Sequence, residues 1–205
     1  MSQPIPTPVL KALHSRGFDT LSGLVDHETL TALHEASKIY ENASLRERKN
    51  AFDTTPSLRQ TFEQLESRVK ERIPGATMTD YCFYISKSKE QNWPLSMHQD
   101  KNLPEYLQLS EDSQVEWLHK GFWIRINLDD NDEQTGALRV IPGSHKNGIQ
   151  SESPENGQAL TISAKRGDIV VFSPLLFHGS NRMATSGQRR VFQCLFTHPE
   201  NIVSA

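Results

Sequence analysis

The spacing of apolar residues changes at Gly75, and this change limits the possible folds more than any other feature of the sequence. Before Gly75 the apolar residues recur at helical intervals of three and four. After it they alternate with polar residues or form short runs bounded by turns, which indicates a β-sandwich or barrel. We therefore predict one domain over residues 1–205, with a helical layer in residues 1–75 and a jelly-roll core in residues 76–200. The predicted helices span residues 8–17, 26–40 and 57–73, and residues 18–24 are expected to form a brief extended or turn segment after the first helix.

Eight short stretches after Gly75 have strand-like composition, and turn-forming residues separate them. Asp130-Asn131-Asp132, Pro142-Gly143 and Gly167-Asp168 are such turns. The predicted fold is therefore mainly β (α+β), a double-stranded β-helix (jelly roll, cupin-like) with an N-terminal helical layer. The predicted strands are residues 77–86, a strand ending at His98, and residues 121–128, 137–141, 160–163, 168–172, 176–178 and 190–197.

Two longer polar segments interrupt the predicted strands. Residues 102–119 are rich in charge, and residues 146–158 are rich in Ser, Glu, Pro and Gly. We expect both to be loops over the mouth of the barrel, where functional loops are commonly placed. Residues 41–50 are charged and poorly patterned, which predicts a loop or a frayed helix.

Composition narrows the classes of partner. A formal charge of −3 and a pI near 6.2 provide no basic surface for nucleic acid and no polybasic patch for a membrane. The N-terminus lacks the apolar core of a signal peptide, and no run approaches the roughly 20 apolar residues that span a bilayer. We expect a cytoplasmic monomer or homodimer that binds a small-molecule substrate, and neither nucleic acid nor membrane. Cys82 and Cys194 lie in apolar runs without a Cys-x-x-Cys pair, so buried free thiols are expected.

The segment His98-Gln99-Asp100 carries a candidate metal site. Residues i and i+2 of a strand point to one face, so His98 and Asp100 project together while Gln99 turns away. With a distant histidine, His178, they form a triad of two histidines and one carboxylate, which leaves half of an octahedral Fe(II) sphere open. Eight histidines and 25 acidic residues also make a chance His-x-Asp pair possible. Three further histidines, His14, His27 and His34, lie in or near predicted helices and are expected to be solvated. His145 is expected to have a structural role in a turn.

Several motifs occur in a specific order along the second half of the chain. Together they make the sequence similar to the phytanoyl-CoA dioxygenase family of Fe(II)- and 2-oxoglutarate-dependent oxygenases, over roughly residues 81–197. The motifs are Asn92-Trp93, His98-Gln99-Asp100, Asn127-Leu128-Asp129-Asp130, Gly136-Ala137-Leu138, Ile141-Pro142-Gly143-Ser144-His145, His178-Gly179-Ser180 and Arg189.

The resemblance implies roles for five residues. His98, Asp100 and His178 match the family's iron ligands and form the catalytic centre. Arg189 matches the arginine that grips the distal carboxylate of 2-oxoglutarate, and Ser180 matches a hydroxyl that assists it. A planar guanidinium suits a carboxylate because it offers paired donors. The implied cofactors are Fe(II), 2-oxoglutarate as cosubstrate, and O2.

The resemblance also implies a reaction, which is hydroxylation of an unactivated C–H bond of a small molecule with release of succinate and CO2. Asp100 stands where a glycine or alanine would leave room for a halide, so hydroxylation is preferred to halogenation. The chain offers no obvious region for a coenzyme A moiety, so an acyl-CoA substrate is not supported. Arg190 follows Arg189 and is expected to face the other way.

Strand alternation and closeness to His98 in the sequence indicate further site residues. Trp123, Arg125 and Asn127 share one face of a predicted strand, and Ile124 and Ile126 share the other. Arg125 and Asn127 are expected to line the site and to bind the proximal carboxylate of the cosubstrate or an acidic substrate; the alternative is a solvated strand. Additional candidates for the substrate pocket are Tyr81, Phe83, Lys87, Trp93, Trp123 and Gln99, with plain core as the alternative for the aromatic ones.

Two other classes of protein stay open from the sequence. One is a cupin-like metalloenzyme that uses the triad without 2-oxoglutarate and has no use for Arg189 and Ser180. The other is a jelly roll that has lost activity and serves in binding or structure. Cosubstrate-dependent turnover separates these classes from the predicted dioxygenase.

Overall fold

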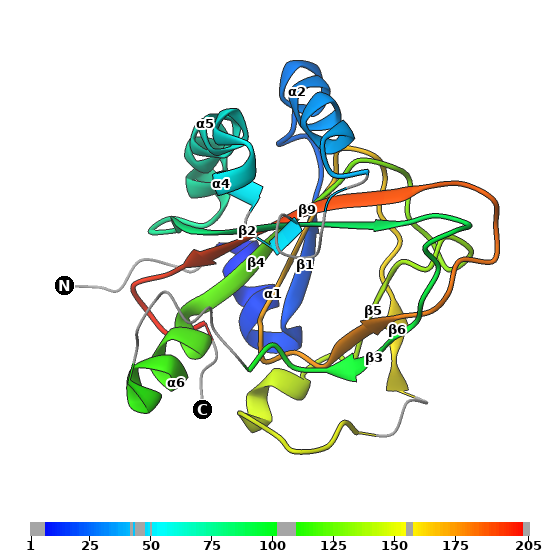
Figure 1. Ribbon diagram of the computed structural model, residues 1–205. Helices are drawn as coiled ribbons and strands as arrows, with labels where there is room; N and C mark the ends of the chain where they lie inside the picture. Colours follow the sequence, from blue (N-terminus) through cyan, green and yellow to red (C-terminus); the bar gives the residue numbers. More distant parts are fainter. Residues whose placement is uncertain are drawn as a thin grey trace.

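Two antiparallel sheets face each other in the computed structural model, which describes residues 7–41, 43, 48–49, 51–101, 110–154 and 158–202. This arrangement is the predicted double-stranded β-helix (Figure 1). The large sheet has the order β1 (Phe18–Leu21), β7 (Ile169–Phe172), β4 (Gly121–Asn127), β9 (Arg189–Thr197) and β2 (Thr77–Lys87). The small sheet has the order β3 (Leu95–His98), β8 (His178–Ser180), β5 (Leu138–Val140) and β6 (Leu160–Thr161).

Helices cover the outer face of the large sheet. Figure 1 shows α2, α4 and α5 on the side of this sheet that faces away from β3, β5 and β6. As predicted, Asp26 caps α2, because its carboxylate accepts a hydrogen bond from the Thr29 N–H at 2.8 Å. The α-helices are α1 (Pro8–Arg16), α2 (His27–Lys38), α4 (Ala51–Thr54), α5 (Pro56–Arg72) and α6 (Glu111–Lys120), and Ser144–Asn147 forms a 3-10 helix, η2.

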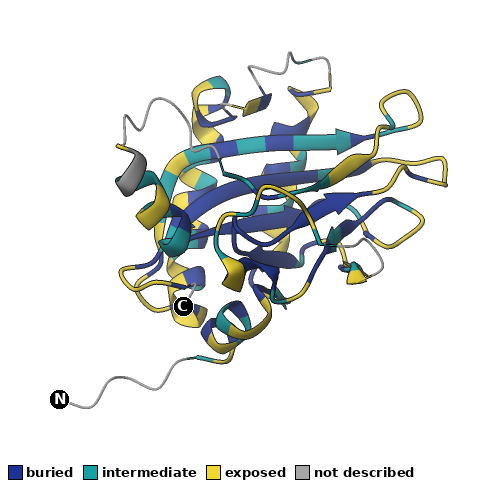
Figure 2. Cartoon of the chain, turned by 90° about the horizontal axis from the view of Figure 1, so that it is seen from below, coloured by how far each residue is buried: buried dark blue, intermediate teal, exposed yellow. Residues whose placement is uncertain are grey.

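Strand alternation divides the interior into two apolar cores. Ile124 and Ile126 of β4 pack outward with Phe62 of α5 and the other helical residues. Trp123 of the same strand lies in a second core between the two sheets. Figure 2 shows the central strands almost entirely buried while the connecting loops are exposed. The predicted isoleucine face is therefore confirmed as the helix-packed face, and the face of Arg125 turns into the barrel.

The described structure corrects two expectations. Part of the segment predicted as a loop is helix α6, which begins because the Ser110 hydroxyl accepts from the Ser113 N–H; residues 102–109 lie outside the described residues, as does most of 41–50. His34 is not fully solvated, because its Nε2 lies 3.2 Å from the Leu128 carbonyl oxygen. The extended segment expected after the first helix contains strand β1, which pairs with β7.

No helix in the described part of the chain has both the length and the apolar composition that crossing a bilayer requires.

Candidate metal centre

Three side chains meet where β3 and β8 lie side by side. His98 ends β3, His178 begins β8, and the two residues are direct partners in the antiparallel register, with ring centroids 4.4 Å apart. The carboxylate of Asp100 lies 3.4 Å from Nε2 of each imidazole. The three prospective ligand atoms lie within 4.8 Å of one another, and no other such group of three occurs among the described residues.

The orientation of both imidazoles suits a metal ion. Nδ1 of His98 lies 2.8 Å from the Ser96 carbonyl oxygen, and Nδ1 of His178 lies 2.8 Å from the Leu176 carbonyl oxygen. A carbonyl oxygen only accepts, so each Nδ1 holds the proton and each Nε2 presents a lone pair toward Asp100. Burial raises the pKa of the Asp100 carboxyl, but the two imidazoles, when protonated on Nε2, lower this pKa well below its ordinary value. A metal ion bound at both Nε2 atoms would take the place of those protons. Two neutral imidazole nitrogens and an ionised carboxylate are a donor set that fits Fe(II).

Gly179 keeps this cluster together because it lets β3 approach β8. A Cβ at Gly179 would lie 2.6 Å from the Leu95 carbonyl oxygen, which is backbone and cannot retreat without moving β3. We expect Gly179→Ala to lower the free energy of unfolding by about 1–3 kcal/mol and to weaken metal binding. Urea unfolding and a metal titration measure the two effects. Gly187→Ala is the control, since a Cβ at Gly187 has no atom within 4 Å; equal behaviour of both variants would contradict the close-approach explanation.

A cavity of about 410 Å³ opens beside the triad. Its apolar lining comes from both sheets, and its polar lining includes all three residues of the metal cluster. Six of the residues predicted for cofactor or substrate line it, namely Phe83, Lys87, Trp93, Arg125, Ser180 and Arg189. Sequence reasoning missed Lys49, Ile85, Leu95, Leu138 and Gln193, which also line it. Ile85 could have been found, because it lies between Phe83 and Lys87 on the same strand face.

Lys87 and Arg189 are buried cations that face each other across β2 and β9. The Lys87 Nζ donates to Ser180 Oγ at 2.8 Å and to the Asn181 carbonyl oxygen at 2.6 Å. Arg189 donates through Nη1 to the Gly136 carbonyl oxygen, while its buried Nε has no partner among the described residues. Burial lowers the pKa of Arg189 to about 10. Burial and the charges of Arg189 and Arg125 lower the pKa of Lys87 to about 7. Such unneutralised cations beside a hydroxyl form a site for an anion.

Arg125 adds a third buried cation to the cavity. It lies on β4 opposite Gln193 of β9, and its Nη1 donates to Gln193 Oε1 at 3.0 Å. Burial and the charge of Arg189 lower the pKa of Arg125 well below its ordinary value, while Asp100 raises it. Arg125 therefore lies within electrostatic reach of both the metal ligands and Arg189.

Asn127 lies outside the cavity lining, which corrects the expectation that it lines the site. Its Nδ2 donates to the Asp168 carbonyl oxygen at 3.0 Å, and its Oδ1 accepts from Asn131 Nδ2 at 2.7 Å. The amide nitrogen thus holds the turn before β7, and the amide oxygen holds the segment that follows β4. Asn127 therefore supports the fold, because both polar atoms of its side chain already form hydrogen bonds within the protein.

The aromatic candidates separate into two groups. Trp93 and Phe83 line the cavity, whereas Tyr81 and Trp123 do not. Tyr81 and Trp123 instead pack against each other and against Phe83, with ring centroids 5.2–5.6 Å apart, in the core between the sheets. The alternative of plain core therefore describes Tyr81 and Trp123.

Gln99 turns away from the cavity, as alternation predicts. Its Nε2 donates to the carbonyl oxygens of Gly148 and Leu175, and its Oε1 accepts from the Gln150 N–H. Gln99 thus ties the loop after η2 to the segment that carries Asp100. Arg190 also faces away from Arg189, and it forms two hydrogen bonds with the Asp129 carboxylate at 2.7 and 3.0 Å.

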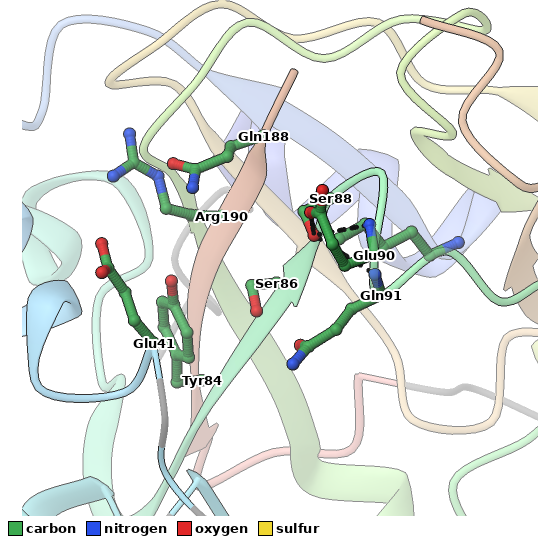
Figure 3. A pocket seen from close by; sticks show the side chains of 9 residues that line it. Glu41, Tyr84, Ser86, Ser88, Glu90, Gln91, Gln188 and Arg190 are labelled. Atoms are coloured by element: carbon green, nitrogen blue, oxygen red, sulfur yellow. Dashed lines mark hydrogen bonds between the residues drawn. The ribbon is translucent and has the colours of Figure 1, made fainter. Parts of the chain in front are cut away.

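A second cavity of about 190 Å³ lies on the other side of the β2 and β9 ends. Figure 3 shows its polar lining, in which Ser88 and Glu90 are already hydrogen-bonded to each other. No residue of the triad lines it, and its Arg190 is paired with Asp129. Its described lining consists of Glu41, Tyr84, Ser86, Lys87, Ser88, Glu90, Gln91, Gln188 and Arg190. We therefore place the candidate site in the larger cavity.

A double-stranded β-helix with a two-histidine, one-carboxylate cluster beside its cavity defines the cupin-like class of metal-binding jelly rolls. Within this class, the chain belongs to the phytanoyl-CoA dioxygenase (PhyH) family, whose family model matches residues 26–191.

Two curated relatives illustrate the sequence similarity. Peroxisomal phytanoyl-CoA dioxygenase of Mus musculus is 34% identical in an alignment of 84 residues that covers 32% of this chain and 25% of the relative. Dioxygenase olcK of Penicillium canescens is 32% identical over 74 residues, which is 36% of this chain and 24% of the relative. The matched region thus spans about a quarter of the length of these curated relatives.

Solved structures share the fold over nearly the whole chain. EvdO2 from Micromonospora carbonacea var. aurantiaca, complexed with 2-oxoglutarate, has a TM-score of 0.73 at 17% identity and covers 100% of this chain and 96% of its own. HygX from Streptomyces hygroscopicus, with nickel and 2-oxoglutarate bound, has a TM-score of 0.69 at 14% identity and covers 96% and 88%. At these identities the likeness establishes the fold.

Proposed function

We propose that the protein is an Fe(II)- and 2-oxoglutarate-dependent dioxygenase that hydroxylates an unactivated C–H bond of a small molecule, with release of succinate and CO2. One observation carries the proposal. Among the described residues, a cluster of metal donors shares a single cavity with buried cations that have no carboxylate partner. A bound metal ion would account for the three donors but not for Arg189. An anionic cosubstrate would account for the buried guanidinium of Arg189.

The roles of the residues follow from the geometry. Nε2 of His98, Nε2 of His178 and the Asp100 carboxylate are proposed to hold the iron, and the Nδ1 hydrogen bonds orient both rings. Arg189 and Ser180 are proposed to bind the distal carboxylate of 2-oxoglutarate. When bound, the iron, 2-oxoglutarate and O2 supply the oxidising chemistry.

Lys87 joins this proposed cosubstrate site, which revises its expected role in binding substrate. Its ammonium already donates to Ser180 and lies opposite Arg189, so the three groups can bind one carboxylate together. The apolar side chains of Phe83, Ile85 and Leu138 line the rest of the cavity and keep water from the reacting groups.

The cavity contents favour the dioxygenase over the two alternatives. A cupin-like metalloenzyme without 2-oxoglutarate would bury Arg189 and Lys87 with no anion to neutralise them, which is unfavourable. An inactive jelly roll would have no need of two imidazoles with their Nε2 atoms turned to one carboxylate. The cytoplasmic location and the monomeric or homodimeric state stay predictions.

Anaerobic titration of the Fe(II)-loaded protein with 2-oxoglutarate tests the proposal. We expect a visible charge-transfer band that saturates with one equivalent of cosubstrate, and succinate release once O2 is admitted. Iron binding without such a band would reject the proposal and favour the cupin-like metalloenzyme.

The lowered pKa of Lys87 predicts how pH affects the cosubstrate. Below pH 7 the free protein carries a protonated Lys87, so binding of the dianion needs no proton uptake there. Above pH 7 Lys87 of the free protein is deprotonated, and it must take up a proton when the dianion binds. The affinity for 2-oxoglutarate therefore falls as pH rises. We expect about a tenfold loss between pH 7 and pH 8.5 in the wild type. Lys87→Met is expected to bind weakly at both values, and a persistent pH dependence in this variant would contradict the assignment to Lys87.

A further inference from the structure

The cavity contains more buried positive charge than its proposed cofactors neutralise. Three buried cations line it, and their exposed fractions are 1% for Lys87, 5% for Arg125 and 2% for Arg189. Asp100 is the one carboxylate among the described residues of the lining, and no ion pair joins these cations to a carboxylate in the described structure. Buried unpaired charges are costly, so each cation requires an anionic partner or a pKa shift toward neutrality.

Adding the proposed cofactors leaves an excess of positive charge. Fe(II) and the 2-oxoglutarate dianion neutralise each other, and Asp100 offsets one of the three cations. Two positive charges remain when Lys87 is protonated, and one remains when it is neutral. In a buried cavity this excess attracts an anion strongly, because the local dielectric constant is low.

The position of Arg125 separates it from the cosubstrate clamp. Lys87 and Arg189 come from β2 and β9 and are direct partners in the register, with Ser180 bonded to Lys87. Arg125 comes from β4, and Gln193 holds it from the neighbouring strand. The bond to Gln193 uses one of the five N–H donors of the guanidinium, so a ligand carboxylate can still be bound in a bidentate manner.

The remaining walls indicate the body of the ligand. Phe83, Ile85, Trp93, Leu95 and Leu138 give the cavity an apolar and aromatic lining. Its volume of about 410 Å³ also has to hold 2-oxoglutarate, and it lies near the lower limit for pockets that enclose drug-sized ligands. The part of the substrate beside the metal is therefore compact. The exposed Lys49, which also lines this cavity, adds positive charge that draws in an anion.

We infer that the substrate is a compact carboxylic acid with an apolar or aromatic body, whose carboxylate pairs with Arg125. This inference rests on the proposed function, because it assigns to the substrate the charge that metal and cosubstrate leave unneutralised. It also gives a reason for a buried arginine that the cosubstrate clamp does not need.

Matched pairs of acids and amides test the inference on the Fe(II)-loaded protein saturated with 2-oxoglutarate. The probes are 3-phenylpropanoate with 3-phenylpropanamide and hexanoate with hexanamide, titrated anaerobically by calorimetry. In the wild type each acid is expected to bind about tenfold or more tightly than its amide. In Arg125→Gln this preference falls to about twofold, while the concentration of 2-oxoglutarate that half-saturates the charge-transfer band stays within about threefold of wild type.

Two controls separate charge recognition from damage to the fold. Lys38→Gln removes an exposed lysine of α2 that pairs with Glu35, and it is expected to keep the full preference for acids. Thermal unfolding of the ligand-free Arg125→Gln protein is expected to occur at or above the wild-type temperature, because a buried unpaired charge has been removed. If this variant unfolds instead, Arg125→Met provides the same comparison with an apolar side chain.

The inference is overturned if acids and amides bind the wild type equally, or if the acid preference survives Arg125→Gln. It is also overturned if Arg125→Gln weakens 2-oxoglutarate as strongly as it weakens the acids, since Arg125 would then belong to the cosubstrate. A band that forms normally without acid preference rejects this inference alone. Absence of the band in the wild type rejects the proposed function, and the inference falls with it.

Discussion

Replacement of His178 by alanine is expected to abolish succinate formation and to reduce Fe(II) affinity by more than about 100-fold. Loss of a residue that only orients a metal ligand already costs about 10–100-fold in metal affinity, and His178 is proposed as a ligand itself. The loss should be large because His178 is the buried partner of the cluster, opposite His98 in the register. Anaerobic iron titration and succinate release measure both effects.

The matched control for His178→Ala is His27→Ala. His27 is an exposed histidine at the start of α2, and its side chain is remote from the cavity. This variant should retain wild-type iron affinity and turnover. Unchanged iron affinity in His178→Ala would remove the basis of the metal assignment, whatever the activity.

Replacement of Arg189 by alanine is expected to raise the 2-oxoglutarate concentration needed for half-saturation by about 100-fold or more. Removing one partner of a buried charge pair costs about 3–5 kcal/mol, because the other charge stays buried without a partner. In this case the group that loses a partner is the distal carboxylate of the cosubstrate, which keeps only Lys87 and Ser180. Titration of the charge-transfer band at fixed iron measures the change.

A cosubstrate analogue and a neighbouring arginine sharpen this test. 2-Oxovalerate lacks the distal carboxylate, so wild type should bind it far more weakly than 2-oxoglutarate, whereas Arg189→Ala should discriminate little between the two. Arg190→Gln is the control, since Arg190 pairs with Asp129 outside the cavity. We expect this control to lower the free energy of unfolding by about 1–2 kcal/mol without changing cosubstrate affinity. Strong discrimination by Arg189→Ala would place the distal carboxylate elsewhere.

The metal cluster could be predicted because its geometry depends on short-range rules. A spacing of two residues in an extended chain places the side chains of His98 and Asp100 on one side. The order of the motifs identified His178 as the third member of the cluster. The same alternation separated Arg189 from Arg190 correctly. Alternation also predicted that the isoleucines of β4 pack on core while Arg125 faces the barrel.

The remaining site residues depend on the pairing of distant strands, which a single sequence does not display. Gln193 faces Arg125 only through the register of β4 with β9, and Leu138 reaches the cavity only through β5. Asn127 lies on the strand face expected for the site, but its side-chain amide forms hydrogen bonds with the Asp168 carbonyl oxygen and with Asn131. Helix α6 was not predicted because its segment is rich in charged residues and was interpreted as a loop. The start of this helix depends on the N-cap at Ser110.

The two faces of the large sheet have consequences for engineering. Tyr84, Ile124 and Ile126 on its outer face pack in the core beneath the helices, whereas Phe83, Ile85 and Arg125 on its inner face line the cavity. Positions 83, 85 and 125 can therefore be randomised to seek new substrates while positions 84, 124 and 126 are held constant. A library built on this two-residue alternation is expected to change the cavity lining while the helix-packed core is retained.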